Sequence, residues 1–259
     1  MCIRDSYYPD VLMVNNGGQS FDIAWTQSND AVITGGNPRP ARGVHPFDYD
    51  EDGDLDIYVS NYRLQPNWLW RNDGDFNFSD VAAQLGNVDG DGGLGAWGHT
   101  IGSAWCDFDN DGHLDLYVSA YSAAIEHLAA EALKHPYRTQ KAKLYQGDGK
   151  GGFIDVAQRM GWTRPVTPMG ANFGDIDHDG LLDCYLGTGY PRLSGLMPSV
   201  LYVNRGDRFD DVTLSSRMGN LQKGHGVAFV DLDNDGEQDV FEQMGGAFPG
   251  DGYYDALYE

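Results

Sequence analysis

The chain has 259 residues, of which 41% are hydrophobic, and a formal net charge of −22. This length and composition can supply the core of one large domain or two small ones. The acidic excess argues against nucleic acid and anionic membrane surfaces as partners, because both are polyanions. No apolar run reaches the roughly 18 residues that a membrane-spanning helix needs, so we expect no membrane span.

The first residues carry little information about the fold. Residues 1–6 lack the basic and then apolar succession of a signal peptide and match nothing in the rest of the chain. We interpret them as a boundary artefact, so a missing signal says little about the full-length protein. Residues 10–23 then place apolar residues on either side of an Asn-Asn-Gly turn, which predicts a β-hairpin.

A nine-residue motif with aspartate at positions 1, 3, 5 and 9 and glycine at position 6 occurs four times, at 48–56, 107–115, 175–183 and 231–239. Oxygen ligands that alternate along a tightly curled loop can all turn inward, and glycine allows the sharp turn. Calcium takes six to eight oxygens, whereas magnesium prefers a stricter octahedron with several retained waters. We therefore predict about four Ca²⁺ ions, one in each loop.

The predicted ligands are four carboxylates and the main-chain carbonyl of position 7 in each loop. They are Asp48, Asp50, Asp52, Asp54, Asp56, Asp107, Asp109, Asp111, His113, Asp115, Asp175, Asp177, Asp179, Leu181, Asp183, Asp231, Asp233, Asp235, Glu237 and Asp239. Carboxylates about 5 Å apart repel by roughly 1–3 kcal/mol per pair at the dielectric of a protein surface. We expect the loops to open without the ions, which makes the ions structural.

Each loop lies between two predicted strands. A glycine precedes each first aspartate by five residues, at Gly43, Gly102, Gly170 and Gly226, and a strand-like apolar run follows each loop. Hairpins with Asn, Asp or Gly turns then follow at 68–82, 144–157 and 201–213. Four antiparallel strands form one blade of a β-propeller, and the glycine suits an innermost strand where neighbouring blades converge.

We therefore predict an all-β fold, a β-propeller segment of four-stranded blades with the ion loops between strands one and two. Three blades are whole, at about 42–97, 98–169 and 170–223, and two are partial, at 7–41 and 224–259. Because both ends contain the third-strand segment, we interpret the chain as a fragment of a larger propeller. Residues 122–135 are rich in helix formers and predict one helical insertion, either functional or a cap over apolar surface. The glycine-rich segment 87–98 predicts a flexible connection.

The pattern Asp-x-Asp-x-Asp-Gly-x-x-Asp between two strands, followed by a Leu-Tyr-x-Asn-x-Gly hairpin, resembles the FG-GAP/VCBS repeat of integrin-type β-propellers. Residues 98–105 and 224–229 resemble the cartilage acidic protein family. Residues 245–251 resemble the segment that runs, in that family, into an ASPIC/UnbV domain, which is absent from this sequence. The resemblance covers nearly the whole chain from Tyr7. It implies a calcium-binding propeller that is secreted, periplasmic or on the cell surface, with a largely undefined molecular activity.

In line with this resemblance, we predict a recognition or adhesion scaffold with a protein or glycan ligand. Several aromatic residues near loops or strand ends would hold a glycan if they clustered on an exposed face, and would otherwise fill the wedges between blades. They are Tyr62, Trp68, Trp70, Trp97, Tyr121, Trp162 and Tyr190.

The alternative is a secreted, hydrolase-like enzyme with its site at the mouth of the propeller channel. Its candidate groups are His45, His99, His178, His225, Glu51 and Glu242. No Gly-x-Ser-x-Gly elbow is present, so we assign no catalytic residue, and whether the chain is an enzyme stays open.

Two further features have plain structural interpretations. Residues 205–207 spell Arg-Gly-Asp, a tripeptide known for integrin recognition, but they fall in a predicted hairpin turn. Cys106 and Cys184 take places that hold mostly apolar residues in the other repeats, so we expect buried thiols.

Overall fold

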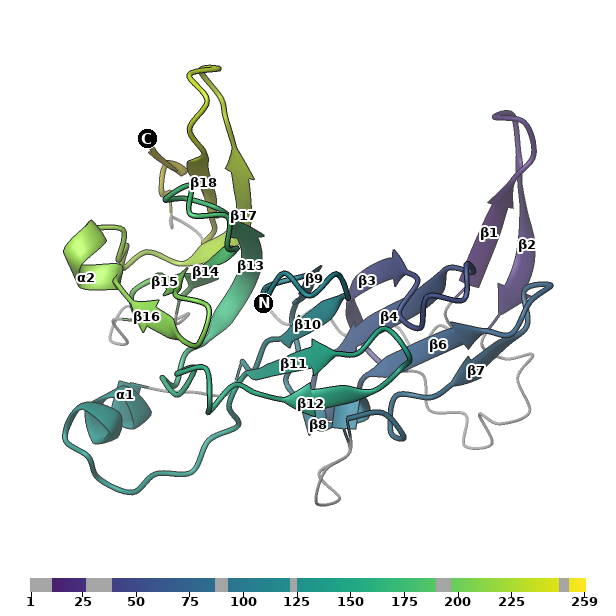
Figure 1. The fold of residues 1–259 in the computed structure, drawn as a ribbon, viewed down its shortest axis with the longest axis horizontal. Coiled ribbons are helices and arrows are strands. Elements are labelled where there is room, and N and C mark those ends of the chain that lie inside the picture. The colour runs from purple at the N-terminus through teal and green to yellow at the C-terminus, as the bar shows by residue number, and fades with distance from the viewer. Residues whose placement is uncertain (1–10, 27–38, 87–92, 122–124, 190–196, 247–251) are drawn as a thin grey trace.

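The computed structural model describes residues 11–26, 39–86, 93–121, 125–189, 197–246 and 252–259. Among these residues, five successive antiparallel sheets form what we number blades 1 to 5 (Figure 1). Blade 1 contains β1 (Val11–Asn15) and β2 (Phe21–Thr26). Blade 2 contains β3 (Ala41–Phe47), β4 (Asp56–Asn61), β6 (Trp68–Asn72) and β7 (Phe78–Asp80).

The remaining blades repeat this plan. Blade 3 contains β9 (Ser103–Cys106), β10 (Asp115–Val118), β11 (Lys143–Gly147) and β12 (Phe153–Asp155). Blade 4 contains β13 (Pro168–Gly174), β14 (Asp183–Thr188), β15 (Val200–Asn204) and β16 (Phe209–Asp211). Blade 5 contains β17 (Gly224–Val230), β18 (Asp239–Met244) and β19 (Ala256–Tyr258).

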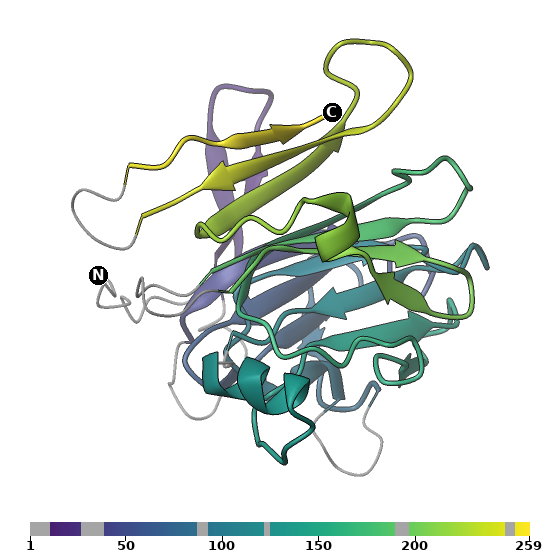
Figure 2. The same ribbon diagram turned by 90° about the vertical axis from the view of Figure 1, so that its left-hand side faces the viewer.

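In every blade, strands that follow one another in the chain pair side by side. The blades succeed one another along an arc and, seen from the side, lie face to face (Figures 1 and 2). The predicted propeller segment with three whole and two partial blades is therefore confirmed. A short pair that the repeat did not predict, β5 (Gln65–Pro66) with β8 (Trp97–Gly98), joins blade 2 to the segment that enters blade 3.

The hydrophobic core lies between the blades. The second strand of each whole blade carries a fully buried tyrosine, and each ring belongs to a different cluster. Tyr58 packs between blades 2 and 3, Tyr117 between blades 3 and 4, and Tyr185 between blades 4 and 5. Since each cluster takes side chains from two blades, a blade buries its apolar faces only when its neighbours are present.

The innermost strands of blades 4 and 5 approach each other closely. A Cβ added at Gly170 in β13 would overlap the carbonyl oxygen of His225 in β17. The Asn172 side chain donates to the carbonyl of Val227 across the same gap, at 3.3 Å. The prediction that glycine is needed where neighbouring blades converge is thus confirmed at Gly170. It does not apply at Gly102, where a Cβ would lie 3.8 Å from its nearest neighbour.

The predicted helical insertion contains α1 (Ile125–Ala132), which is shorter than the segment 122–135. Its Leu128 packs against the cluster between blades 3 and 4, while Leu133 is 68% exposed. Of the two roles left open, these contacts match a cap over apolar surface. A second helix, α2 (Thr213–Ser216), follows β16.

The expectation of a flexible connection at 87–98 is wrong for its described part, which begins at residue 93. Residues Gly93–Gly95 form a buried 3-10 turn with Leu94 only 1% exposed. The hydroxyl groups of Tyr58 and Tyr145 donate to the carbonyls of Leu94 and Gly93, at 3.1 and 2.8 Å. A Cβ at Gly95 would lie 3.1 Å from the backbone nitrogen of Ala83, so this turn packs closely against the segment that follows β7.

Cys106 and Cys184 are free thiols and both are buried, as predicted. Burial raises the pKa of both thiols well above its ordinary value. Within the described residues, no helix is long and apolar enough to span a membrane.

Candidate metal centres

The four acidic loops connect the first and second strands of blades 2 to 5 and share one backbone conformation. The glycine at position 6 has φ between 87° and 97° in all four. A Cβ there would meet nothing within 4 Å, so the backbone conformation, rather than space, requires glycine. Position 4 also has a positive φ, between 57° and 62°, at Glu51, Asn110, His178 and Asn234.

Hydrogen bonds from their own backbone curl these loops. In blade 2, Asp48 accepts the N–H groups of Asp52 and Gly53 at 3.1 and 2.9 Å. The N–H of Asp54 donates to the Asp52 carboxylate at 2.9 Å. The other three loops repeat all three bonds, so the carboxylates at positions 1 and 5 are oriented by the loop itself.

The aspartate at position 9 has a structural role that sequence analysis missed. In blade 3 the two oxygens of Asp115 accept the N–H of Phe108, in the loop, and of Gly147, in β11, both at 2.9 Å. Blades 2 and 4 repeat this pair of bonds through Asp56 and Asp183. Position 9 therefore fixes the loop to the third strand of its own blade.

The structure brings three carboxylates of each loop together. In blades 2, 3 and 4 these are positions 1, 3 and 9, and in blade 5 they are positions 1, 3 and 5; one oxygen from each lies within 4.8 Å of the others. The sets are Asp48, Asp50 and Asp56; Asp107, Asp109 and Asp115; Asp175, Asp177 and Asp183; and Asp231, Asp233 and Asp235. Asp52, Asp111, Asp179 and Asp239 are outside these sets, and the carbonyl ligands at position 7 stay a prediction.

In blades 2 and 3, the carboxylate at position 3 is the group whose surroundings fit a cation best. Oδ1 of Asp50 and Oδ1 of Asp109 are buried and have no hydrogen-bond donor. A buried acceptor without a donor costs free energy. Burial raises the pKa of both carboxyl groups, and the neighbouring aspartates raise it further. An all-oxygen set of this kind suits a hard cation such as Ca²⁺ or Mg²⁺, so the residues present fit the predicted ion.

Burial also changes the titration of position 9. It raises the pKa of Asp56 and Asp183 to about 6 and that of Asp115 to about 7, although two N–H bonds act in the opposite direction on each. Desolvation favours the neutral carboxyl, whereas a neighbouring cation favours the charged form. These sites therefore hold carboxylates that a bound cation would stabilise.

Neighbouring loops contact one another through position 4. Glu51 in blade 2 lies 2.6 Å from Nδ1 of His113 in the loop of blade 3. Asn110 in blade 3 donates to the carbonyl of Gly180 in the loop of blade 4, at 2.7 Å. The loops of these three blades therefore line one edge of the molecule as a connected series.

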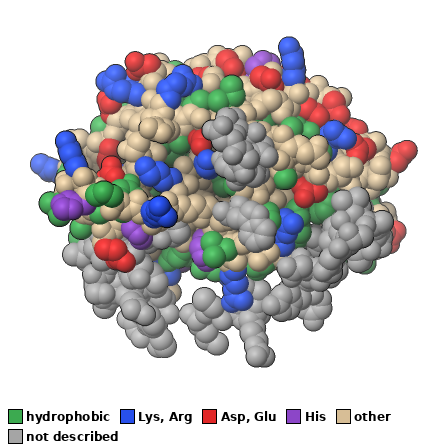
Figure 3. Space-filling view, turned by 90° about the horizontal axis from the view of Figure 1, so that it is seen from below, with side chains coloured by type: hydrophobic (Ala, Val, Ile, Leu, Met, Phe, Trp, Pro, Cys, Tyr) green, Lys and Arg blue, Asp and Glu red, His purple; other side chains and the backbone are tan. Residues whose placement is uncertain are grey.

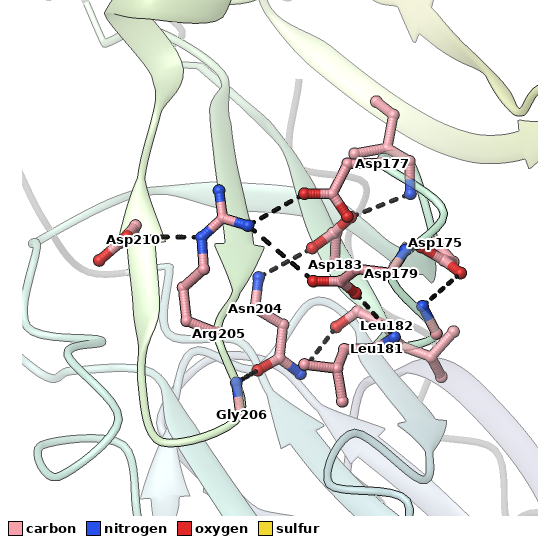
Figure 4. A network of polar contacts seen from close by, with 12 residues as sticks. Asp175, Asp177, Asp179, Leu181, Leu182, Asp183, Asn204, Arg205, Gly206 and Asp210 are labelled. Carbon is pink, nitrogen blue, oxygen red and sulfur yellow. Dashed lines mark hydrogen bonds and ion pairs between the residues drawn. The ribbon is translucent and has the colours of Figure 1, made fainter.

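The hairpin turn of blade 4 lies against its acidic loop (Figure 4). Nη1 of Arg205 lies 3.0 Å from Oδ2 of Asp177. The N–H of Arg205 donates to the carbonyl of Arg208, and Gly206 has φ 83°, so the tripeptide at 205–207 forms the predicted turn. The Asn204 side chain donates to the carbonyl of Phe108 in the loop of blade 3, at 2.7 Å. Sequence analysis did not connect this turn with the loop.

Glu242 stands twelve positions into the last motif, where an EF-hand loop has its bidentate glutamate. The structure instead buries it in β18, against blade 4. Its carboxyl group lies 2.6 Å from the Ser199 hydroxyl and 3.0 Å from the Tyr185 hydroxyl. Glu242 is thus a polar contact between blades rather than a ligand of the loop.

The aromatic candidates divide into two groups. Trp68, Trp70 and Trp162 are at most 4% exposed and fill the spaces between blades. Tyr62 and Tyr121 are half-buried and lie near each other, with ring centroids 6.5 Å apart, at the end of the blades opposite the acidic loops. Tyr190 and the side chain of Trp97 lie outside the described part of the chain.

The candidate catalytic groups do not form one constellation. His99 packs beside Tyr62, with ring centroids 5.2 Å apart, and its Nδ1 has no hydrogen-bond partner. His178 is in the loop of blade 4, whereas His45 and His225 are in β3 and β17. Among the described residues, no hydrogen bond or ring contact joins two of these four histidines.

Surface charge is mixed in spite of the net charge of −22. The face in Figure 3 carries several lysine and arginine side chains over its middle, interspersed with acidic and histidine side chains. The acidic excess therefore does not form a uniform coat over the molecule.

Comparison with known proteins supports the repeat. A family model described as an FG-GAP-like repeat matches residues 48–118, from the acidic loop of blade 2 to the end of β10. No curated protein matches the chain. The fold and this match together define a β-propeller segment with an FG-GAP-like repeat. The narrower resemblance to the cartilage acidic protein family stays a prediction.

Several solved structures match the chain at low identity and with TM-scores below 0.5. One is a lectin of Agrocybe aegerita that recognises non-reducing terminal N-acetylglucosamine, with 17% identity, a TM-score of 0.46, and coverage of 90% of this chain and 54% of the lectin. A second is the exotype rhamnogalacturonan lyase YesX, with 14% identity, a TM-score of 0.43, and coverage of 80% of this chain and 38% of the lyase. A third is a rhamnogalacturonan lyase of Bacillus licheniformis, with 16% identity, a TM-score of 0.42, and coverage of 80% of this chain and 40% of the lyase. The chain thus spans about half or less of the length of these proteins.

Proposed function

We propose that this chain is a calcium-stabilised β-propeller segment that acts as an extracellular or cell-surface recognition scaffold. The observation that carries the proposal is the buried, donor-free oxygen of Asp50 and of Asp109, each within a set of three converging carboxylates. A divalent cation would supply the missing electrostatic partner. It would also offset the repulsion between carboxylates that cannot all move apart, because position 9 is fixed to the third strand.

Calcium fits better than magnesium because each loop offers many protein oxygens, and calcium takes six to eight oxygen ligands, whereas magnesium usually keeps several of its water ligands. Calcium sites of extracellular modules typically have dissociation constants of about 10⁻⁴–10⁻³ M, which suits a protein that is always exposed to calcium. In line with the resemblance to integrin-type propellers, the proposed location is secreted, periplasmic or on the cell surface, and the proposed ions are structural rather than regulatory.

The test is thermal unfolding in EDTA, followed by calcium and magnesium added back separately, with a count of bound ions. A ligand that binds only the folded state at 100 times its dissociation constant adds about 2.7 kcal/mol per site to the free energy of unfolding. We expect calcium to raise the midpoint, with about four ions bound per chain, and magnesium to raise it far less. Unchanged midpoints with both ions would refute the proposal.

A pair of variants connects this result to the loops. Asp50→Asn removes a charge from the donor-free position and should reduce the calcium-dependent part of the midpoint shift. Asp75→Asn removes the same charge from an exposed hairpin turn of the same blade and should leave that part unchanged. Asparagine tolerates the positive φ of residue 75, so the control does not strain the turn.

For the recognition role, we place the ligand contact at the cluster of Tyr62, His99 and Tyr121. These three side chains are half-buried, and the guanidinium of Arg42 lies over the Tyr62 ring, 5.3 Å from its centroid. We propose that a sugar ring or an aromatic side chain of the ligand packs against this cluster. Glycan-array and protein-array binding should fall for Tyr62→Ala and persist for Tyr254→Ala, a tyrosine that is 94% exposed in blade 5. Equal binding by both variants would place the contact elsewhere.

The enzymatic alternative needs an acid, a base or a nucleophile within reach of one substrate. Its carboxylate candidates have other partners: Glu51 pairs with His113, and Glu242 is buried against Ser199 and Tyr185. The described residues therefore offer no geometry on which a mechanism can be built.

A further inference from the structure

A positive charge of the chain itself lies against the acidic loop of blade 4 (Figure 4). Nη1 of Arg205 lies 3.0 Å from Oδ2 of Asp177 and 3.9 Å from Oδ2 of Asp179. Nε of the same guanidinium lies 3.6 Å from Asp210, which holds it on the loop side of the hairpin. Asp177 is position 3 of the loop and belongs to its set of converging carboxylates.

The other whole blades carry an acidic residue at the corresponding place. The three positions are aligned by a shared hydrogen bond: the N–H of the preceding residue, which is Asn72, Gly147 or Asn204, donates to the position 9 aspartate of the same blade. The equivalents of Arg205 are Asp73 in blade 2 and Asp148 in blade 3. Asp73 pairs with Arg71 and Ser79, and Asp148 accepts N–H groups of its own turn, so neither bonds to a loop carboxylate in the way that Arg205 does.

Blade 3 offers a neutral contact with position 3. The side-chain amide of Gln146 donates to Oδ2 of Asp109, and Oδ1 of the same carboxylate is the donor-free oxygen. The position 3 carboxylate of blade 3 thus meets an amide dipole, whereas that of blade 4 meets a full positive charge.

We propose that Arg205 is a tethered counter-ion of the loop 175–183 and makes its affinity for a divalent cation weaker than that of the loops in blades 2 and 3. This inference rests on the proposed calcium binding. Arginine stays protonated in proteins, so an incoming ion either binds beside the guanidinium or displaces it. Repulsion between a divalent ion and one positive charge about 6 Å away, even at the dielectric of water, corresponds to an affinity about tenfold weaker.

The same contact has the opposite effect when the ion is removed. The guanidinium offsets part of the repulsion among Asp175, Asp177 and Asp179, so this loop should keep its conformation in EDTA better than the loops at 48–56 and 107–115. Backbone amide exchange in EDTA should therefore be slower at 179–181, whose N–H groups donate to loop carboxylates, than at the matching residues 52–54 and 111–113.

The main experiment is a calorimetric calcium titration of the metal-stripped full chain and four variants. Asp177→Asn identifies the site of blade 4, because it should remove a weak site and leave the tighter sites of blades 2 and 3. Arg205→Gln removes the charge and should tighten the weak site about tenfold. Arg205→Lys keeps the charge and should leave it weak. Arg208→Gln is the matched control, since Arg208 lies in the same turn but pairs with Asp207 and Asp210.

The outcomes separate this inference from the function on which it rests. Suppose that calcium binds but Arg205→Gln changes no site's affinity by more than twofold, or that Asp177→Asn removes a tight site. Either result would overturn the inference and leave calcium binding intact. Tightening by Arg205→Gln but not by Arg205→Lys or Arg208→Gln would support it. Absence of any calcium binding up to millimolar concentration would remove both the inference and the proposed function.

Discussion

In each whole blade, one aspartate holds two separate segments of chain together. Asp115 is fully buried, and its two oxygens accept one N–H from the loop and one from β11. Loss of such an acceptor leaves two buried donors without a partner, at roughly 1–3 kcal/mol each. At the residue scale, the final aspartate of the motif therefore stabilises the blade through its own hydrogen bonds, independently of a bound ion.

Glu242 gives the clearest pH dependence at this scale. Burial between blades raises its pKa from an ordinary value of 4.5 to about 7, against the opposite effect of the Ser199 and Tyr185 hydroxyls. Between these two values the unfolded chain has released the proton while the folded chain keeps it. The free energy of unfolding therefore falls as pH rises through this range, by about 3 kcal/mol, and changes little from this group above pH 7.

We expect Glu242→Gln to remove this part of the pH dependence, because the amide does not titrate. The measurement is urea unfolding in EDTA at pH 5 and pH 7.5 for both proteins. The stability of the wild type relative to the variant should decrease at the higher pH. Since Asp56, Asp115 and Asp183 titrate in the same range in both proteins, their effects cancel in the difference. A difference that is independent of pH would contradict the burial of an uncharged Glu242.

At the scale of single elements, α1 shows how an insertion is attached to the propeller. Figure 2 shows the helix below the stacked blades, and its Leu128 packs against the cluster between blades 3 and 4. Its Leu133, just beyond the helix, is exposed. The helix thus covers the junction between blades 3 and 4, and it adds a side chain to a cluster formed mainly by their β-strands.

Truncation of these two leucines tests the capping role. Leu128→Ala should lower the free energy of unfolding by about 1–2 kcal/mol, less than for a fully buried leucine because Leu128 is only partly buried. Leu133→Ala should change it by no more than about 0.5 kcal/mol. Chemical denaturation with calcium present measures both. Equal effects would show that α1 does not contribute to the core.

At the scale of the whole molecule, stability depends on how closely the blades converge. The innermost strands of blades 4 and 5 leave no room for a Cβ at Gly170, whereas Gly102 in the innermost region of blade 3 has room. Because each core cluster is shared between two blades, a shift of one inner strand disturbs the packing on both of its faces.

Gly170→Ala should therefore lower the free energy of unfolding by about 3 kcal/mol or more, since β13 must move away from β17. Gly102→Ala adds the same methyl group at the equivalent position of the previous blade and should change stability by less than about 1 kcal/mol. Thermal unfolding of the two variants in calcium makes the comparison. Similar midpoints would mean that the blades do not approach each other as described.

Much of this organisation could be predicted because its causes are local in the chain. The four motifs, the strands on either side of them and the hairpin turns depend on residues within about ten positions of one another, and a glycine such as Gly53 is required by its own backbone conformation. The repetition of this pattern gave the number and strand content of the blades, which the sheets confirm. It also placed Cys106 and Cys184 in the core, through comparison of one repeat with the next.

The sequence by itself thus determined the repeating blade and the acidic loops, because period, alternation and turn chemistry act over short distances. Tertiary structure alone decided which groups meet across the fold. Arg205 reaches Asp177 over 28 positions, Glu51 meets His113 over 62, and Glu242 meets Ser199 over 43. The first pair depends on how the strands of one blade lie beside each other, and the other two depend on how neighbouring blades stack. No local pattern in the chain encodes such contacts. The physical reason is that charge and burial at these sites come from neighbouring segments rather than from the residue and its near sequence.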